Sequence, residues 1–246
     1  MVNREELKNY CNTYLDIYKF KDYCPNGLQI EGSLNITKIV SGVSANLELI
    51  ERAIEEKADA IFVHHGVFWD NESKTISGAK RAKIALLLKH NINLFGFHLP
   101  LDDHYEVGNN VELGRRLGIK NMEPVAGGLL WQGELNTNIS DFSKLIEEKL
   151  DRAPQVFGKQ SGKIKKISWC TGAAQGFIED AINLNVDLYL SGEVSEKTPA
   201  VAKENNITFI SAGHHATERY GVQALCKHLC SQFKLQHHFI EVDNSV

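Results

Sequence analysis

The stretch "KIVSGVSANLELIERAIEEKADAIFVHH", residues 38–65, decides the fold. Residues 38–45 are a short apolar run that ends in small residues, as is typical of a strand followed by a turn. Residues 46–57 carry apolar side chains at helical spacing, and residues 58–65 form a second apolar run. This order predicts a strand, a helix and a second strand, the unit from which parallel sheets are built.

The same order continues along the chain. Further helices and strands are predicted at residues 78–91, 92–98, 165–174, 175–185, 186–193 and 207–218. The second half repeats the order of the first, and Glu193, His214 and Glu218 align with His65, His98 and Asp102. We therefore predict an α/β fold with largely parallel sheets and two similar α/β lobes from an internal duplication.

The predicted lobes are residues 1–125 and 126–246, with the candidate site in the cleft between them. The limit is placed in "EPVAGGLLWQGELNTN", residues 123–138, because this stretch is rich in glycine and turn residues.

The composition excludes several classes of protein. Apolar residues are 43% and charged residues 24% of the 246 residues, as in ordinary globular proteins. The net charge of -4, without a dense basic run, argues against nucleic acid as a partner. No apolar run reaches the roughly 18 residues of a membrane helix, and the start of the chain lacks the apolar core of a signal peptide. The five cysteines form no CxxC pair, so we expect reduced thiols and a cytoplasmic protein.

Polar side chains gather where predicted strands end. His64 and His65 close one strand, His98 and Asp102 follow another, and His214 and Glu218 follow a third. The carboxyl ends of parallel strands meet at one edge of a sheet, where ligands bind. Gly66 permits the turn that lets two neighbouring imidazoles share one site.

Each cluster also has a structural interpretation. The histidine pair could cap a strand, with one imidazole in solvent and the other satisfied by hydrogen bonds. His-x-x-x-Glu on a helix is a common exposed pair, and "HLPLDDH", residues 98–104, could be a proline-containing loop with a helix-capping aspartate. Convergence of three clusters favours a metal site.

Five of these residues, His64, His65, Asp102, His214 and Glu218, exceed what a simple three-ligand zinc site needs. They suit two divalent ions that share a carboxylate, with water completing the coordination. Mixed imidazole and carboxylate ligands are compatible with iron, manganese, zinc, cobalt or nickel. The sequence contains neither a phosphate-binding glycine loop nor a G-x-S-x-G serine motif.

Five stretches resemble the Nif-three-like family in its short bacterial form, whose members are called GTP cyclohydrolase I type 2 homologues. The resemblance covers essentially the whole chain and rests on "YCPNGLQIEG" (23–32), "VHHGVFW" (63–69), "FHLPLDDH" (97–104), "SGEVSE" (191–196) and "GHHATERYG" (213–221). It implies a two-lobed protomer, a dinuclear metal centre and a ring-shaped homohexamer built as a trimer of dimers.

The resemblance also implies the roles of individual residues. The implied metal ligands are His64, His65, Asp102, His214 and Glu218. Glu218 is the expected bridge between the two ions. His98 and Glu193 are not ligands in this pattern, and we expect them to move protons beside the metals.

Two functions are compatible with this pattern. The first is a dinuclear metal-dependent hydrolase that acts on a nucleotide or a related small polar substrate through water activated by the metals. The alternative is a non-enzymatic hexameric ring that handles metal or serves as an adaptor for protein or nucleic acid. The polar residues expected around the metals, His98, Glu193 and His215, favour the enzyme.

Overall fold

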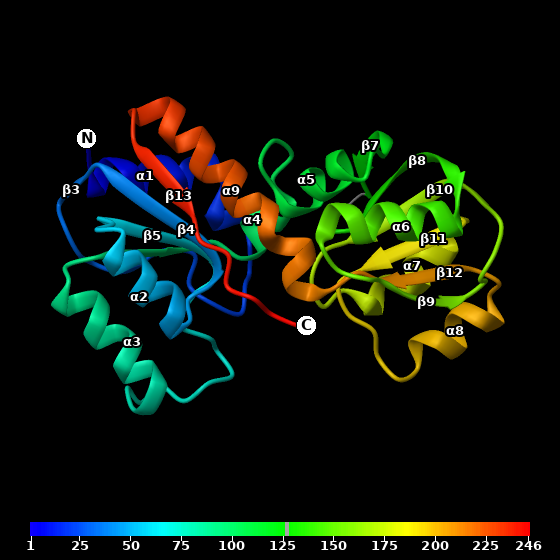
Figure 1. The fold of residues 1–246 in the computed structure, drawn as a ribbon, viewed down its shortest axis with the longest axis horizontal. Helices are drawn as coiled ribbons and strands as arrows, with labels where there is room; N and C mark the ends of the chain where they lie inside the picture. Colours follow the sequence, from blue (N-terminus) through cyan, green and yellow to red (C-terminus); the bar gives the residue numbers. More distant parts are fainter. Residues whose placement is uncertain (126–127) are drawn as a thin grey trace. The chain divides into compact units, whose positions relative to one another are not determined.

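The computed structural model describes residues 1–125 and 128–246 (Figure 1). The chain forms two compact units, the first made of Met1–Gly108 and Gly221–Asp243, the second of Asn109–Tyr220 and Asn244–Val246. These limits differ from the predicted lobes 1–125 and 126–246, and Ala126, on one side of the predicted limit, lies outside the described residues. The segment Gly221–Asp243 belongs to the first unit, where its strand, residues 236–239, pairs parallel to the strand of residues 38–44.

The first unit contains a five-stranded sheet. Its strands are, in spatial order, β13 (Gln236–Phe239), β4 (Lys38–Ser44), β5 (Ala60–His65), β6 (Asn93–Gly96) and β2 (Gly27–Ile30). The first four are parallel, and β2 is antiparallel to β6. The remaining elements of this unit are β1 (Val2–Asn3), β3 (Asn35–Ile36), α1 (Arg4–Tyr14), η1 (Ile17–Lys19), α2 (Leu47–Glu55), α3 (Gly78–Lys89), α4 (Leu99–Asp103) and most of α9 (His214–Phe233).

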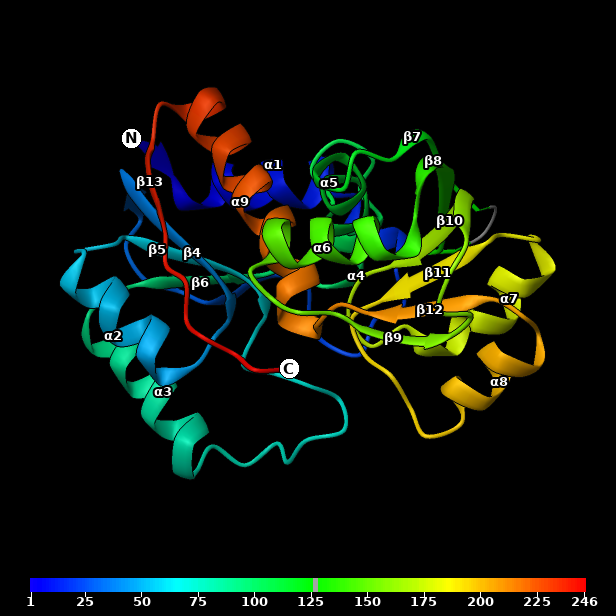
Figure 2. The ribbon, with the colours of Figure 1, turned by 45° about the vertical axis from the view of Figure 1, so that its right-hand side comes forward.

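Helices cover both faces of this sheet (Figure 2). Along β5, Ala60 and Phe62 join a buried cluster with residues of α1 and α9, whereas Ile61 and Val63 join another with residues of α2 and α3. A strand that is buried on both faces has no polar alternation, which explains its unbroken apolar run.

The second unit contains a six-stranded sheet. Its strands are, in spatial order, β7 (Lys120–Pro124), β8 (Trp131–Asn138), β10 (Lys163–Cys170), β11 (Leu188–Ser191), β12 (Thr208–Ser211) and β9 (Gln155–Gly158). Among the described strands of this sheet, only the pairings β10–β11 and β11–β12 are parallel, so the expectation of a largely parallel sheet is correct for the first unit and wrong for this one. Its helices are α5 (Asn109–Arg116), α6 (Ile139–Leu150), η2 (Gln175–Phe177), α7 (Ile178–Asn183) and α8 (Thr198–Glu204).

Strand β8 lies inside the stretch 123–138 that was expected to be a turn-rich boundary. It pairs antiparallel with both β7 and β10. One face of β8 is partly exposed, so its side chains are mostly polar and the apolar signal of a strand is weak.

The two units share part of their strand order. Three parallel strands are followed by an antiparallel edge strand in each, as β4-β5-β6-β2 and β10-β11-β12-β9. The internal duplication itself stays a prediction, because two βαβ units of independent origin can also share this strand order. Among the described residues, no helix has the length and apolar character that crossing a membrane requires.

Candidate functional site

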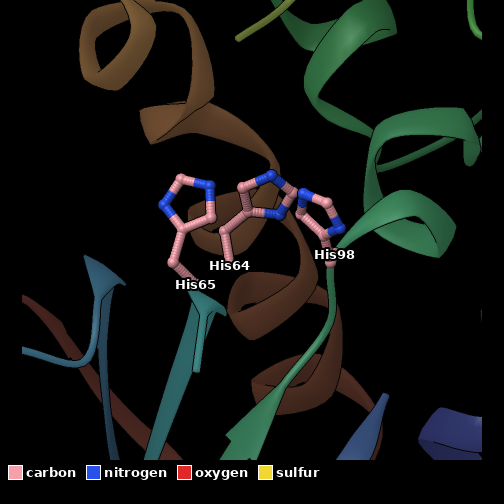
Figure 3. Close-up of side chains that lie close together, drawn as sticks. All are labelled: His64, His65 and His98. Atoms are coloured by element: carbon pink, nitrogen blue, oxygen red, sulfur yellow. The ribbon is translucent and has the colours of Figure 1, made fainter. Parts of the chain in front are cut away.

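Three imidazoles gather at the carboxyl end of the first unit's sheet (Figure 3). His64 and His65 are the last residues of β5, and His98 follows β6 and precedes α4. The ring centroid of His64 lies 4.6 Å from that of His65 and 5.0 Å from that of His98. Adjacent parallel strands therefore bring together side chains that are more than 30 positions apart, as predicted.

Hydrogen bonds orient these rings. The Nδ1 atom of the buried His64 lies 2.8 Å from the carbonyl oxygen of Phe97. A carbonyl only accepts hydrogen bonds, so Nδ1 carries the proton and the lone pair of His64 is on Nε2. Nδ1 of His65 is bonded to the Ser44 hydroxyl at 3.0 Å. Metal-binding histidines in proteins are held in this way by a partner on the second ring nitrogen.

Gly66 has a different role from the predicted one. Its backbone is not in the left-handed region, so the turn after the histidines does not depend on glycine there. A Cβ at Gly66 would lie 2.2 Å from the Gln29 side chain, which accepts a hydrogen bond from the Val67 amide. Glycine therefore provides space for Gln29 beside the strand end.

Asp102 belongs to the same unit and lies close to His64. It is in the first turn of α4, its residue is 6% exposed, and its Oδ1 is 3.5 Å from Nε2 of His64. The stretch 98–104 is thus helical over Leu99–Asp103, and the capping bond comes from Asp22, which accepts from the Leu99 amide. An imidazole and a carboxylate at this separation are suited to bind one cation together.

Asp22 is the residue that the sequence did not reveal. Its Oδ1 lies 2.7 Å from Nδ1 of His98, and Asn26 accepts a hydrogen bond from the His98 amide. Burial acts to raise the pKa of Asp22, but the hydrogen bonds from His98 and Asn26 outweigh it and the pKa is lowered. The only signal was its position directly before the stretch 23–32 that carries part of the family resemblance.

Not every neighbouring histidine joins the site. His104 bonds the Tyr14 carbonyl through Nε2 and accepts from the Glu106 and Val107 amides through Nδ1, so both of its nitrogens serve the fold.

A second set of side chains lies in the second unit. His214 begins α9 and Glu218 follows one turn later, with 3.1 Å between Nε2 and Oε2. Glu193 lies 2.7 Å from Nδ1 of His214. Burial acts to lower the pKa of His214, but the hydrogen bonds and charges of Glu218 and Glu193 outweigh it and raise the pKa to about 9. The prediction that Glu193 moves protons stays a prediction, and its contact is with His214.

Gly172 provides the space for the Glu218 carboxylate. Its φ is +68°, and a Cβ there would lie 2.1 Å from Oε1 of Glu218 and 3.3 Å from Nε2 of His214. The Gly172 amide also donates to the hydroxyl of Thr217, which precedes Glu218. The loop after β10 is therefore shaped around this carboxylate.

The donor sets fit divalent cations. In the first unit, ligand atoms of His64, His65 and His98 lie within 4.8 Å of one another. In the second unit, His214 and the buried carboxylate of Glu218 lie one helical turn apart. The Glu218 carboxylate occupies space that a Cβ at position 172 would fill. Imidazole nitrogens whose other ring nitrogen is already bonded, together with carboxylates, are the donors that iron, zinc or manganese take in proteins.

The whole chain is similar to known proteins. Residues 2–245 match the model of the family described as Duf34/NIF3 (NGG1p interacting factor 3). A protein from Allochromatium vinosum, named GTP cyclohydrolase 1 type 2 homolog, is 48% identical over 99% of this chain and 98% of its own. A Pseudomonas aeruginosa protein of the same name is 47% identical, with 97% and 96% of the two chains covered.

Solved structures show the same fold. One described as protein ybgI, of unknown function, has a TM-score of 0.94 and 40% identity, with both chains fully covered. The structure of TTHA1606 from Thermus thermophilus has a TM-score of 0.90 and 30% identity, again with both chains fully covered.

Proposed function

Because the chain belongs to the Duf34/NIF3 family, we propose that it is a dinuclear metal-dependent hydrolase that acts on a nucleotide or a related small polar substrate. The proposed ligands of two divalent cations are His64, His65, Asp102, His214 and Glu218, with Glu218 as the bridge. The observation that carries the proposal is the set of oriented imidazoles at the ends of β5 and β6. A structural histidine pair would not need a buried carboxylate beside it, as His64 has.

In the proposed reaction, the metal ligands, Glu193 and His98 have different roles. Divalent cations, when bound, act as Lewis acids and lower the pKa of water that they bind. Glu193 holds His214 through Nδ1 and directs the other nitrogen toward Glu218. His98, whose ring lies beside those of His64 and His65, accepts or returns a proton during hydrolysis.

The nucleotide substrate is supported by the name GTP cyclohydrolase 1 type 2 homolog that the similar proteins carry. Hydrolytic opening of a purine ring, or attack on a phosphate ester or an amide, are the reactions to test.

The proposed assembly is a homohexamer, a trimer of dimers, in the cytoplasm. The family resemblance supports the ring. The five free thiols, four of them buried, support a reducing compartment. Light scattering after size exclusion tests the assembly, since a hexamer has about six times the mass of the 27.6 kDa chain.

The activity is tested with protein reconstituted separately with iron, zinc and manganese. GTP, other nucleotides and simple phosphate esters are incubated with each form, and products are separated by chromatography. The Asp102→Asn variant should lose kcat/KM by about 100-fold or more, because a ligand is removed. Asp103→Asn, which changes the neighbouring carboxyl on the same helix, should not. Stable metal binding without turnover of any substrate would favour the alternative, a non-enzymatic metal-binding ring.

A further inference from the structure

Asp22 is a buried carboxylate that accepts hydrogen bonds from several donors. Its side chain is 2% exposed. Oδ1 lies 2.7 Å from both the His98 Nδ1 and the Tyr23 amide nitrogen, and Oδ2 accepts from the Asn26 side chain at 2.8 Å and the Leu99 amide at 3.0 Å. A carboxylate in this position is ionised and can only accept.

The Asp22 carboxylate determines which nitrogen of the His98 ring carries the proton. Because the carboxylate accepts from Nδ1, the neutral ring carries its proton there and its lone pair on Nε2. Figure 3 shows one nitrogen of His98 directed toward His64 and the other directed away. Since Nδ1 is bonded to Asp22, the nitrogen facing His64 is Nε2.

The ring is also fixed from its sides. Trp69 and Tyr23 approach His98 edge to face, with centroids at 5.2 Å and 6.1 Å. The backbone amide of His98 donates to Asn26 at 2.7 Å. A loop that needed only to be anchored would not require this control of the imidazole.

The second unit contains the same arrangement. Glu193, from the loop after β11, lies 2.7 Å from Nδ1 of His214, as Asp22 does from His98. In each unit a carboxylate from a loop thus holds Nδ1 of a histidine that follows a strand end, although Nε2 of His214 also faces a carboxylate, that of Glu218. This pairing was found only from the structure.

We propose that Asp22 is a positioning residue, which keeps the lone pair of His98 on Nε2 facing His64 and His65. This inference rests on the proposed hydrolase function, in which that lone pair accepts the proton. The competing explanation is that Asp22 only caps α4 and anchors the loop of residues 22–26.

The test compares Asp22→Asn with Asp59→Asn. Asp59 is a matched control, because its carboxylate accepts from Thr37 and the Lys38 amide and has no imidazole partner among these bonds. The full-length protein is labelled with 15N-histidine, stripped of metal and studied by solid-state NMR, which reads the proton position on each ring. A His98→Gln difference spectrum assigns the signals.

Wild-type His98 should carry its proton on Nδ1. Asp22→Asn should shift the tautomer ratio toward Nε2–H by about tenfold or more, since a hydrogen bond to a charged acceptor is replaced. Asp59→Asn should leave the ratio unchanged although it also loses stability. If Asp22→Asn does not fold, Asp22→Ala provides the same comparison.

An unchanged His98 tautomer in the folded Asp22 variant would overturn the inference and leave Asp22 as a loop anchor. Metal content, measured on the same samples, separates this outcome from failure of the proposed function. If the wild-type chain binds no metal, the proposed hydrolase function is refuted. The measured tautomer of His98 would still decide the role of Asp22.

Discussion

Replacing Gly172 by alanine should have two distinguishable effects, one on the stability of the fold and one on the position of the Glu218 carboxylate. The first is conformational, since φ is +68° and a side chain in the left-handed region costs about 1 kcal/mol. The second is steric, since the new Cβ would lie 2.1 Å from Oε1 of Glu218, against a practical minimum of 3.0 Å. The carboxylate must therefore move by roughly 0.9 Å, whereas metal ligands tolerate about 0.2 Å.

Gly118→Ala is the matched control. Gly118 has a φ of +70°, and no atom of the part of the chain that the structure describes lies within 4 Å of the position that a Cβ would take there. Both variants should lower the free energy of unfolding by about 1 kcal/mol for the backbone, and Gly172→Ala by about 1 kcal/mol more. Only Gly172→Ala should weaken metal binding, by about 10- to 100-fold.

The assays are chemical denaturation and competition with a chelator of known affinity. Wild-type metal affinity in a folded Gly172→Ala variant would refute the assignment of Glu218 as a ligand. Equal loss of metal in both variants would show that stability, rather than the space at Gly172, controls binding.

Two further predictions concern other residues. Glu193→Gln should weaken metal binding by about tenfold, because His214 loses its charged orienting partner; chelator competition measures this, and an unchanged affinity would contradict it. Burial, reinforced by nearby positive charge, lowers the pKa of His237 from 6.5 to about 4, and its Nε2 is bonded to Ser41. The unfolded chain therefore binds more protons between these values, so the stabilisation is complete above pH 6.5 and is lost as the pH falls toward 4. Allowing for partial exposure, about 1–2 kcal/mol is involved, and His237→Gln should flatten this acid dependence in denaturation curves at pH 7 and 5.

Local patterns predicted the elements that surround the candidate site. The apolar run before His64 predicted β5, and it exists because both faces of that strand are buried. The stretch of residues 214–229 after Gly213 predicted a helix that starts at His214, on which His214 and Glu218, four residues apart, share one face.

Contacts between distant residues could not be predicted in this way. Asp22 meets His98 across 76 positions, and no spacing rule connects a loop carboxylate with a strand end so far away. β8 was missed because its exposed face carries polar side chains, which resemble a loop. Gly66 was assigned a turn because only the structure shows how close Gln29 lies.

Metal analysis of the anaerobically purified protein tests the central claim most directly. The wild type is compared with His65→Ala and Glu218→Ala, and with His90→Ala and Glu196→Ala, which change exposed residues outside the proposed ligand set. We predict about two transition-metal ions per chain in the wild type and both controls. The two ligand variants should remain folded and lose one or both ions. Metal that cannot be restored to the wild type, or metal content indifferent to His65→Ala and Glu218→Ala, would contradict the account.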